Sequence, residues 1–187
     1  MKIIFGLGNP GRQYRNNRHN VGYMVLDELA SRENFIFKRS FRLSAALARK
    51  EINNEEVLFI KPRTYMNNSG LSVKRALSSY KLTLRDILVV YDDIDLPLGK
   101  IRFRESGSCA GHRGMAAILS ALGDEKISRL RVGISRDELT DVVDYVLSDF
   151  SLSEKEILEK VISQAASACI DCVYQGASFV MQQYNSL

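Results

Sequence analysis

Only two histidines occur in this sequence of 187 residues, and both lie in polar, glycine-containing loops. His19 stands in RNNRHNVG and His112 in SGSCAGHRG, so neither has the apolar neighbours of a typical core residue. A neutral imidazole, with an unperturbed pKa of about 6.5, can take a proton from water at physiological pH, and a neighbouring carboxylate stabilises the resulting imidazolium. Asp92 is our candidate for that carboxylate; the alternative is that it only caps a turn in DDIDLP.

Other polar side chains follow three short apolar runs. The runs cover residues 3–5, 57–60 and 87–91, and their branched side chains are typical of strands buried on both faces. The residues that come after these runs are Asn9 and His19, then Tyr65, Met66 and Asn67, and finally Asp92. Ligands of open α/β sheets bind beyond the carboxyl ends of the strands, so we expect these side chains to meet in one site.

The two asparagines suit a substrate that resembles a peptide. Each amide can donate to a carbonyl oxygen and accept from an N–H, so Asn9 and Asn67 are candidates for gripping a peptide backbone. For each, the alternative role is in a turn or a helix cap. The chain has no G-x-S-x-G motif and no cysteine in a catalytic context, so we expect direct attack by water rather than a covalent intermediate.

The stretch GLGNPG contains a G-x-G-x-x-G pattern directly after the first predicted strand. In a dinucleotide-binding fold the third glycine already lies inside a helix whose N-terminus faces the pyrophosphate. Here residues 12–20 are polar, without an apolar period, and helical spacing starts only at Val21. We therefore interpret the glycines as a turn that lets the backbone approach something closely, and we expect no nucleotide cofactor.

The remaining periodicity places helices between and after the strands. Apolar residues repeat at helical spacing from Val21, behind a candidate cap at Asn20, and over 73–80, behind Asn68. Further strands are predicted at 100–104 and 130–134, and further helices after Gly111, near 141–147 and from Ser153 toward the C-terminus. The sum is an α/β fold, a single domain over residues 1–187 with a mixed, twisted β-sheet surrounded by α-helices.

The composition is that of an ordinary globular protein, with 45% hydrophobic and 26% charged residues. The first apolar run ends at Gly6, too early for a signal peptide or a membrane span, so we expect a cytoplasmic protein without membrane contact. The net charge of +4 favours polyanionic partners. Cys169 and Cys172 form one C-x-x-C pair inside a helical pattern, which we interpret as structural thiols rather than a metal or redox site.

Two pairs of arginines are spaced for the surface of a sheet. Arg102 and Arg104 share one face of a predicted strand, and Arg129 and Arg131 repeat the pattern at the start of another. Such arginines can form a merely solvated surface. Two pairs beside a catalytic site favour the alternative, a grip on phosphate groups.

Several long motifs are spread evenly along nearly the whole chain. They are GLGNPG with Tyr14 and RHNVG in the first loop, PRTYMNNSG at 62–70, YDDIDLPLG at 91–99, SGSCAGHRGM at 106–115 and RLRVGI at 129–134. With these motifs the sequence resembles the bacterial peptidyl-tRNA hydrolase family. The resemblance implies hydrolysis of the ester bond between a nascent peptide and the 3′ ribose of tRNA, which recycles peptidyl-tRNA that has dropped off or been released from stalled ribosomes.

The resemblance also implies a role for each matched residue. The family's catalytic base matches His19, the aspartate that assists it matches Asp92, and Asn9 matches a contact to the peptidyl part. The residues implied to contact the substrate or its tRNA are Tyr14, Tyr65, Met66, Asn67, His112, Arg104 and Arg131, the last two at the 5′ phosphate. No metal or other cofactor is implied. The expected partners are peptidyl-tRNA and stalled large ribosomal subunits, bound by a monomer.

One position departs clearly from the family pattern. Where the family usually has asparagine in G-H-N-G, this chain has Arg113, which only donates hydrogen bonds and adds charge. Our hypothesis is that Arg113 reaches a substrate phosphate or folds away to solvent. Asp93, where relatives often carry glutamate, is a milder change.

Two functions of other classes remain open from the sequence. Asp92, Asp93 and Asp95 could ligate Mg²⁺ in a metal-dependent phosphodiesterase, since hard cations prefer oxygen ligands. Alternatively, the chain could be an RNA-binding module that kept the fold and lost hydrolysis. The presence of all four polar residues of the predicted site, Asn9, His19, Asn67 and Asp92, argues against the second alternative.

Overall fold

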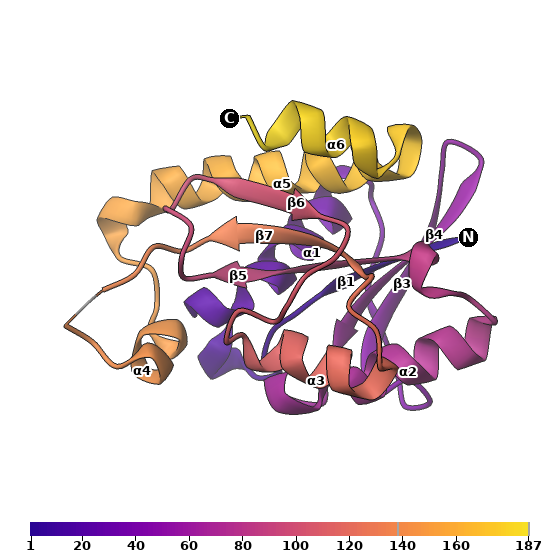
Figure 1. Cartoon of the computed structure of the whole chain (residues 1–187), viewed down its shortest axis with the longest axis horizontal. Coiled ribbons are helices and arrows are strands. Elements are labelled where there is room, and N and C mark those ends of the chain that lie inside the picture. The colour runs from indigo at the N-terminus through magenta and orange to yellow at the C-terminus, as the bar shows by residue number, and fades with distance from the viewer. Residues whose placement is uncertain (138, 187) are drawn as a thin grey trace.

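The computed structural model describes residues 1–137 and 139–186, and one seven-stranded sheet organises them (Figure 1). The strands are β1 (Lys2–Gly6), β2 (Lys38–Ser40), β3 (Ala45–Ile52), β4 (Glu55–Pro62), β5 (Ile87–Asp93), β6 (Ile101–Arg104) and β7 (Ser128–Gly133). Their order is β2-β3-β4-β1-β5-β7-β6. The four central strands are mutually parallel, whereas β2, β3 and β6 run antiparallel to their neighbours. The carboxyl ends of β4, β1, β5 and β7 therefore lie at the same end of the sheet.

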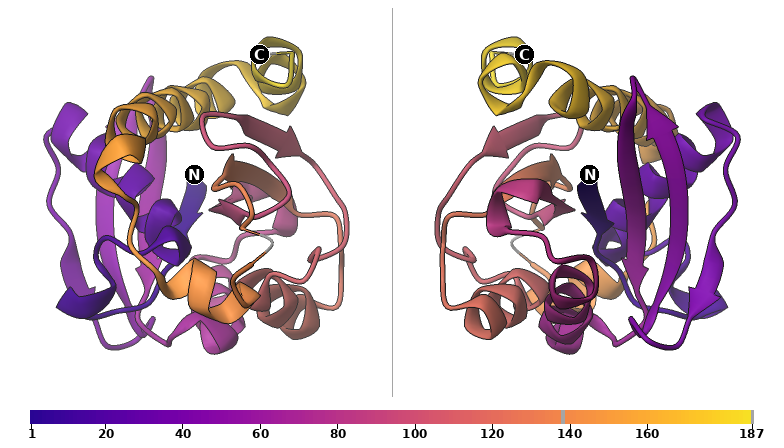
Figure 2. Two further views of the ribbon diagram at one scale, coloured as in Figure 1. Left: turned by 90° about the vertical axis from the view of Figure 1, so that its left-hand side faces the viewer. Right: turned by 90° about the vertical axis from the view of Figure 1, so that its right-hand side faces the viewer.

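Helices cover both faces of this sheet. Those in the described ranges are α1 (Val21–Arg32), α2 (Ser69–Tyr80), α3 (Arg113–Leu122), α4 (Val142–Leu147), α5 (Lys155–Gln175) and α6 (Ala177–Tyr184). In Figure 1, α5 and α6 lie on one side of the sheet and α2 and α3 on the other, and the end-on views of Figure 2 show the same layers. The short α4 lies at the end of the sheet toward which the arrowheads of β5 and β7 point. No helix among the described residues is long and apolar enough to cross a membrane.

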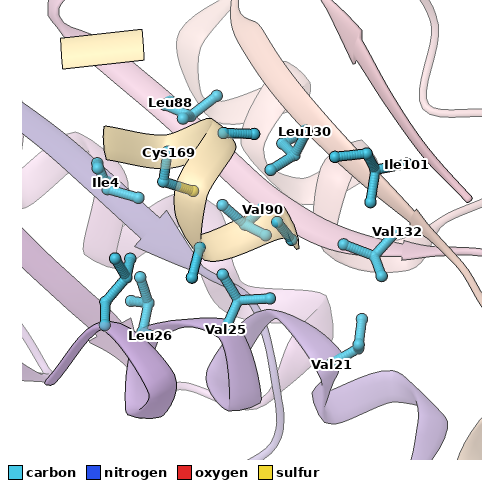
Figure 3. Close-up of a cluster of buried hydrophobic side chains, with 14 of the residues drawn as sticks. Ile4, Val21, Val25, Leu26, Leu88, Val90, Ile101, Leu130, Val132 and Cys169 are labelled. Carbon is cyan, nitrogen blue, oxygen red and sulfur yellow. The ribbon is translucent and has the colours of Figure 1, made fainter. Parts of the chain in front are cut away.

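Each face of the sheet has its own hydrophobic core, because successive side chains of a strand point to opposite faces. On one face Val25 of α1 and Cys169 of α5 pack with Ile4 and Val90 of the sheet (Figure 3). The other core contains Phe5 of β1 and residues of α2 and α3. Since the central strands are covered on both faces, their sequences are continuously apolar rather than alternating.

The structure confirms the predicted α/β class and its mixed sheet, with two differences in detail. The hairpin of β2 and β3 is absent from the sequence-based prediction, because the β3 sequence AALARKEI mixes small and charged side chains without a clear period. The helical structure expected from Ser153 toward the C-terminus is confirmed, and it is divided into two helices. The chain forms α5 and α6, which are separated at Gly176, where φ is 83°, a conformation that favours glycine.

The C-x-x-C pair lies on α5 and faces the core. Cys169 is fully buried, and Cys172, one turn later, packs against the same cluster. Burial raises the pKa of both thiols, that of Cys172 to about 11. Since the thiolate is the reactive and metal-binding form, these positions support the structural interpretation of the pair.

Gly6 at the end of β1 and Gly22 in α1 allow the helix to pack closely against the sheet. A Cβ at Gly6 would lie 2.3 Å from the carbonyl oxygen of Gly22, and one at Gly22 would lie 2.4 Å from that of Val90. Real Cβ atoms do not approach backbone oxygens so closely, so α1 can start directly against β1 and β5 only because both positions lack a side chain. The predicted close approach is confirmed, and its partner is the protein's own backbone.

The substitution Gly22→Ala is expected to lower the free energy of unfolding by ~2 kcal/mol or more. The added methyl group would collide with backbone atoms of Leu7 and Val90, which cannot rotate away as side chains can. Urea unfolding followed by circular dichroism measures the change. Ser31→Ala, at an exposed position of the same helix, is the matched control and should stay within about 0.5 kcal/mol of the wild type. Equal stabilities of the two variants would contradict the packing role of Gly22.

Candidate active site

His19 and Asp92 form a buried pair at the carboxyl end of the sheet. His19 lies in a 3₁₀ turn directly before α1, and Asp92 is on β5. The Nδ1 atom of His19 is 2.9 Å from each carboxylate oxygen of Asp92, and the two residues are only 7% and 3% exposed. A carboxylate can only accept, so this contact assigns the imidazole proton to Nδ1. Nε2 is then the basic nitrogen of a residue that lines a cavity.

His112 holds the same carboxylate. Its Nε2 lies 3.0 Å from Oδ1 of Asp92, and its Nδ1 accepts from the N–H of Met115 at 3.1 Å, which caps the N-terminus of α3. Because Nδ1 accepts, Nε2 carries the proton that is donated to Asp92, and neither nitrogen is left to act as a base. Asp92 is thus held by two imidazoles, and the alternative that it only caps a turn is wrong.

Burial and charge act in opposite directions on this pair. Burial disfavours the protonated form of His19, but the charge and hydrogen bond of Asp92 outweigh burial and raise the pKa of His19 above its ordinary value of 6.5, with Arg113 opposing the rise. For Asp92, burial acts to raise the pKa, yet the two histidines hold it well below the usual range of a carboxyl group. Asp92 therefore remains ionised while His19 titrates.

Asn9 is fixed through its backbone and its side chain. Its N–H donates to Oδ1 of Asn20 at 2.8 Å, and its carbonyl oxygen accepts from Nδ2 of Asn20 at 3.0 Å. Its own Oδ1 accepts from the N–H of Met66 at 2.9 Å, which joins the loops after β1 and β4. Asn20 and Asn68 occupy the predicted N-cap positions of α1 and α2, but neither side chain makes a capping hydrogen bond to its helix. Within the part of the chain that the structure describes, the Nδ2 group of Asn9 has no acceptor and can donate into the cavity that Asn9 lines.

A cavity of about 560 Å³ opens beside His19. The predicted site residues that line it are Asn9, His19, Tyr65, Met66, Asn67, Asp92 and His112. The convergence of three strand ends is therefore confirmed. Tyr14 lies just outside, where its ring meets that of Tyr65 edge-on with 6.5 Å between the centroids. Arg104 and Arg131 are not among the lining residues; they lie on β6 and β7.

Part of the cavity wall is apolar, and the sequence does not predict this wall. Its lining residues are Ile94 and four residues of α4, namely Val142, Val143, Val146 and Leu147. The apolar spacing in DVVDYVL predicts a short amphipathic helix. It does not indicate whether the apolar face of that helix packs against the core or lines a cavity, because both cases have the same spacing. An apolar wall opposite a polar catalytic end suits a ligand with hydrocarbon side chains.

The loop that carries His19 is tied to the segment that contains α4. The guanidinium of Arg18 makes two hydrogen bonds of 3.0 Å to the carboxylate of Glu154. The same guanidinium lies over the rings of Tyr145 and Phe150, 4.5 Å and 4.7 Å from their centroids. These contacts position the His19 imidazole and the apolar wall together.

The arginine pairs face each other across β6 and β7, with Arg102 opposite Arg131 and Arg104 opposite Arg129. A phosphate-binding role is wrong for Arg129, which is 1% exposed and donates to three backbone carbonyls. Arg131 is partly exposed and pairs with Asp93, and Arg104 is exposed. One arginine of the second pair is therefore structural, whereas Arg131 and Arg104 remain accessible.

The three carboxylates of the Mg²⁺ alternative line the same cavity, but among the described residues they do not form one set of ligands. Asp92 and Asp93 are adjacent on β5 and point to opposite faces, and Asp93 accepts from an arginine of β7 and from the N–H of Asp95. Ligand atoms of His19, Asp92 and His112 do lie within 4.8 Å of one another. Both imidazole nitrogens that face Asp92 carry protons, so this group is arranged as a hydrogen-bonded triad rather than as a set of metal ligands.

A mixed α/β sheet with an imidazole–carboxylate pair at its carboxyl end, beside a partly apolar cavity, is the arrangement expected of a hydrolase that uses a general base. The model of the family described as peptidyl-tRNA hydrolase matches residues 3–187. The chain belongs to the peptidyl-tRNA hydrolase family, as its motifs predict.

Similar proteins match this chain from end to end. The peptidyl-tRNA hydrolase of Carboxydothermus hydrogenoformans is 50% identical over 99% of this chain and 98% of its own. That of Brevibacillus brevis is 42% identical over 100% of this chain and 99% of its own. The crystal structure of peptidyl-tRNA hydrolase from Acinetobacter baumannii is 29% identical and superimposes with a TM-score of 0.89, covering 98% of this chain and 95% of that one. The fold and the candidate site thus lie inside the shared region.

Proposed function

We propose that this protein hydrolyses the ester bond between a peptide, or an N-blocked amino acid, and the 3′ ribose of tRNA. The observation that carries the proposal is the His19–Asp92 pair in the wall of the cavity, in a chain that belongs to the peptidyl-tRNA hydrolase family. The pair supplies a general base, and the apolar part of the cavity offers space for the acyl group.

His19 acts as the base on a water molecule. Its Nε2 takes a proton while the water oxygen attacks the ester carbonyl, and the tetrahedral intermediate then expels the ribose 3′ oxygen, which takes the proton from the imidazolium. One water is thereby divided between a carboxylic acid and a 3′ hydroxyl. Asp92 holds Nδ1 of His19 throughout and stabilises the imidazolium with its negative charge.

The amides and the apolar wall favour an acylated amino group. The Nδ2 group of Asn9 can donate to a peptide carbonyl, and Asn67, exposed at the same cavity, can donate and accept. Met66, which is buried beside them, fixes the floor of the site. A free ammonium group would lose its hydration against the apolar wall, so aminoacyl-tRNA is the poorer substrate.

Aromatic and basic side chains bind the tRNA part. Tyr65 meets the ring of Tyr14 edge-on, and its own side chain is 53% exposed. Its φ of 57° is unusual for a residue other than glycine, and such backbone conformations cluster at functional sites. His112 contacts the substrate from the cavity wall, and Arg104 and Arg131 hold the 5′ phosphate. Contacts of this kind serve many tRNAs, and the binding weakens as salt rises.

The cellular setting follows from the substrate. The protein acts in the cytoplasm on peptidyl-tRNA that has left the ribosome or is released from stalled large subunits. It acts as a monomer of one domain and uses no metal or other cofactor. Family membership and the net charge of +4 support this setting.

Release of labelled peptide from N-acetylaminoacyl-tRNA tests the proposed function. We expect release at the same rate with and without EDTA, because the base and the donors all come from the chain. Aminoacyl-tRNA with a free amino group is the control substrate and should react at least tenfold more slowly. Activity that EDTA abolishes and a divalent cation restores would favour a metal-dependent enzyme. RNA binding without release would favour a binding module that lost hydrolysis.

A further inference from the structure

We infer that Arg113 and Arg136 bind successive phosphates of the single-stranded 3′ end of the tRNA at the catalytic cavity. The inference rests on the proposed function and adds to it a phosphate-binding site for the substrate's single strand. It also assigns a task to the residue at which this chain departs most clearly from the family pattern.

Both arginines line the cavity that contains His19, and both are exposed. Within residues 1–137 and 139–186, neither makes an ion pair or a hydrogen bond through its guanidinium. Two other arginines of β7 already have partners: Arg129 is buried and donates to backbone carbonyls, whereas Arg131 pairs with Asp93 but remains partly exposed. Guanidinium groups form strong, bidentate hydrogen bonds with phosphate, so unpaired ones in a cavity wall are available for such a ligand.

The position of Arg113 selects one particular phosphate. It is the first residue of α3 and follows His112, whose Nε2 is 3.0 Å from Asp92. Its charge acts on His19, whose pKa it lowers, and the positive end of the α3 dipole adds to the local potential. When the ester of the terminal ribose lies at His19, the phosphate that joins this nucleoside to the preceding one is the substrate's nearest anion.

The position of Arg136 extends the same path. It follows β7, which lies between the catalytic strand β5 and the edge strand β6. The proposed contacts for the 5′ phosphate, Arg104 and Arg131, are on β6 and β7. A single strand that leads from Arg131 past the carboxyl end of β7 toward β5 would therefore meet Arg136 and then Arg113.

Carboxylates in the same cavity do not cancel this positive charge. Asp93 is paired with Arg131, and Asp92 is held by two histidines. Among the described residues, Asp95 is then the remaining acidic lining residue, against two guanidinium groups without an ion-pair partner. The local excess of positive charge favours an anionic ligand over a neutral one.

Three substrates that carry the same N-acetylaminoacyl ester separate phosphate binding from other roles. They are the full tRNA, the trinucleotide CpCpA and adenosine, which has no phosphate. For Arg113→Gln, we expect the ratio of kcat/KM on the trinucleotide ester to that on the adenosine ester to fall roughly tenfold, through KM. Arg136→Gln should lower the ratio by about threefold, because its phosphate lies farther from the reacting ester. On the full tRNA, each variant should reduce the salt dependence of KM by about 0.7 in the log–log slope.

Arg85→Gln is the matched control, since it removes an exposed arginine from the opposite end of β5. This control should leave the ratio and the slope unchanged, and Arg113→Lys, which keeps the charge, should recover part of the loss. Equal losses of Arg113→Gln on the trinucleotide and adenosine esters would overturn the inference, because Arg113 would then act on the acyl group or on His19. Wild-type protein that releases peptide from none of the three substrates would instead refute the proposed function itself.

Discussion

The variant His19→Ala is expected to release peptide from N-acetylaminoacyl-tRNA about 10³-fold more slowly than the wild type in kcat, within the range of losses for a general base. The reason is geometric. The Nδ1 atom of His19 faces Asp92 and carries the proton, which leaves Nε2 as the unprotonated nitrogen of a residue that lines the cavity. Single-turnover rates at saturating enzyme measure the chemical step directly. KM should change much less, since contacts to the tRNA come from other residues.

His112→Ala is the informative control, because His112 touches the same carboxylate. Both of its nitrogens are occupied, by Asp92 and by the N–H of Met115, so it cannot take a proton from water. We expect about a tenfold loss of kcat and, from the lost helix cap, about 1 kcal/mol of stability, which urea unfolding detects. A larger loss of kcat for His112→Ala than for His19→Ala would reverse the assignment of the base.

The polar end of the site is predictable from the sequence because parallel strands bring their carboxyl ends together. Asn9, Asn67 and Asp92 each follow or end an apolar run, so the fold class alone places them in one region. The scarcity of histidine reduces the choice of a base to two residues. Which of the two acts depends on tautomers, and those are set by contacts with Asp92 and Met115 that no sequence pattern announces.

Other parts of the site depend on contacts between distant segments. Asn20 has the sequence signature of a helix cap, but its side chain is better satisfied by the backbone of Asn9. Arg129 has the spacing of a surface residue, yet it donates to the carbonyls of a neighbouring loop. The apolar face of α4 looks like any core-facing helix until its place beside His19 is known. In each case the local sequence is compatible with two roles, and contacts with residues far away in the chain determine which role the residue has.

The variant Asp92→Asn is expected to lower kcat by about 10²- to 10⁴-fold while the fold persists. The reason is that asparagine places a donor where one carboxylate oxygen of Asp92 accepts from His19. His112 must donate from Nε2, so the amide oxygen of the new side chain takes the Oδ1 position. Its NH₂ group then occupies the Oδ2 position, 2.9 Å from Nδ1 of His19. Nδ1 of His19 lies 2.9 Å from both positions, but the amide oxygen already accepts from His112 and the NH₂ group can only donate. The tautomer with its proton on Nε2 is therefore favoured, and the nitrogen that should take a proton from water then carries one. Single-turnover rates measure the loss, and circular dichroism checks the fold.

The pH profile of the residual activity gives a second, independent readout of the same variant. In the wild type, Asp92 outweighs burial and raises the pKa of His19 above 6.5, so kcat/KM should fall as the pH drops through that raised pKa and the base becomes protonated. In Asp92→Asn the negative charge is gone, and the two remaining influences, burial and the charge of Arg113, both lower the pKa of His19. The acid limb should therefore move to lower pH, below about 6.5, even though the activity at every pH is smaller. An acid limb at the same pH in both proteins would mean that a group other than His19 controls the reaction, and the general-base assignment would have to be abandoned.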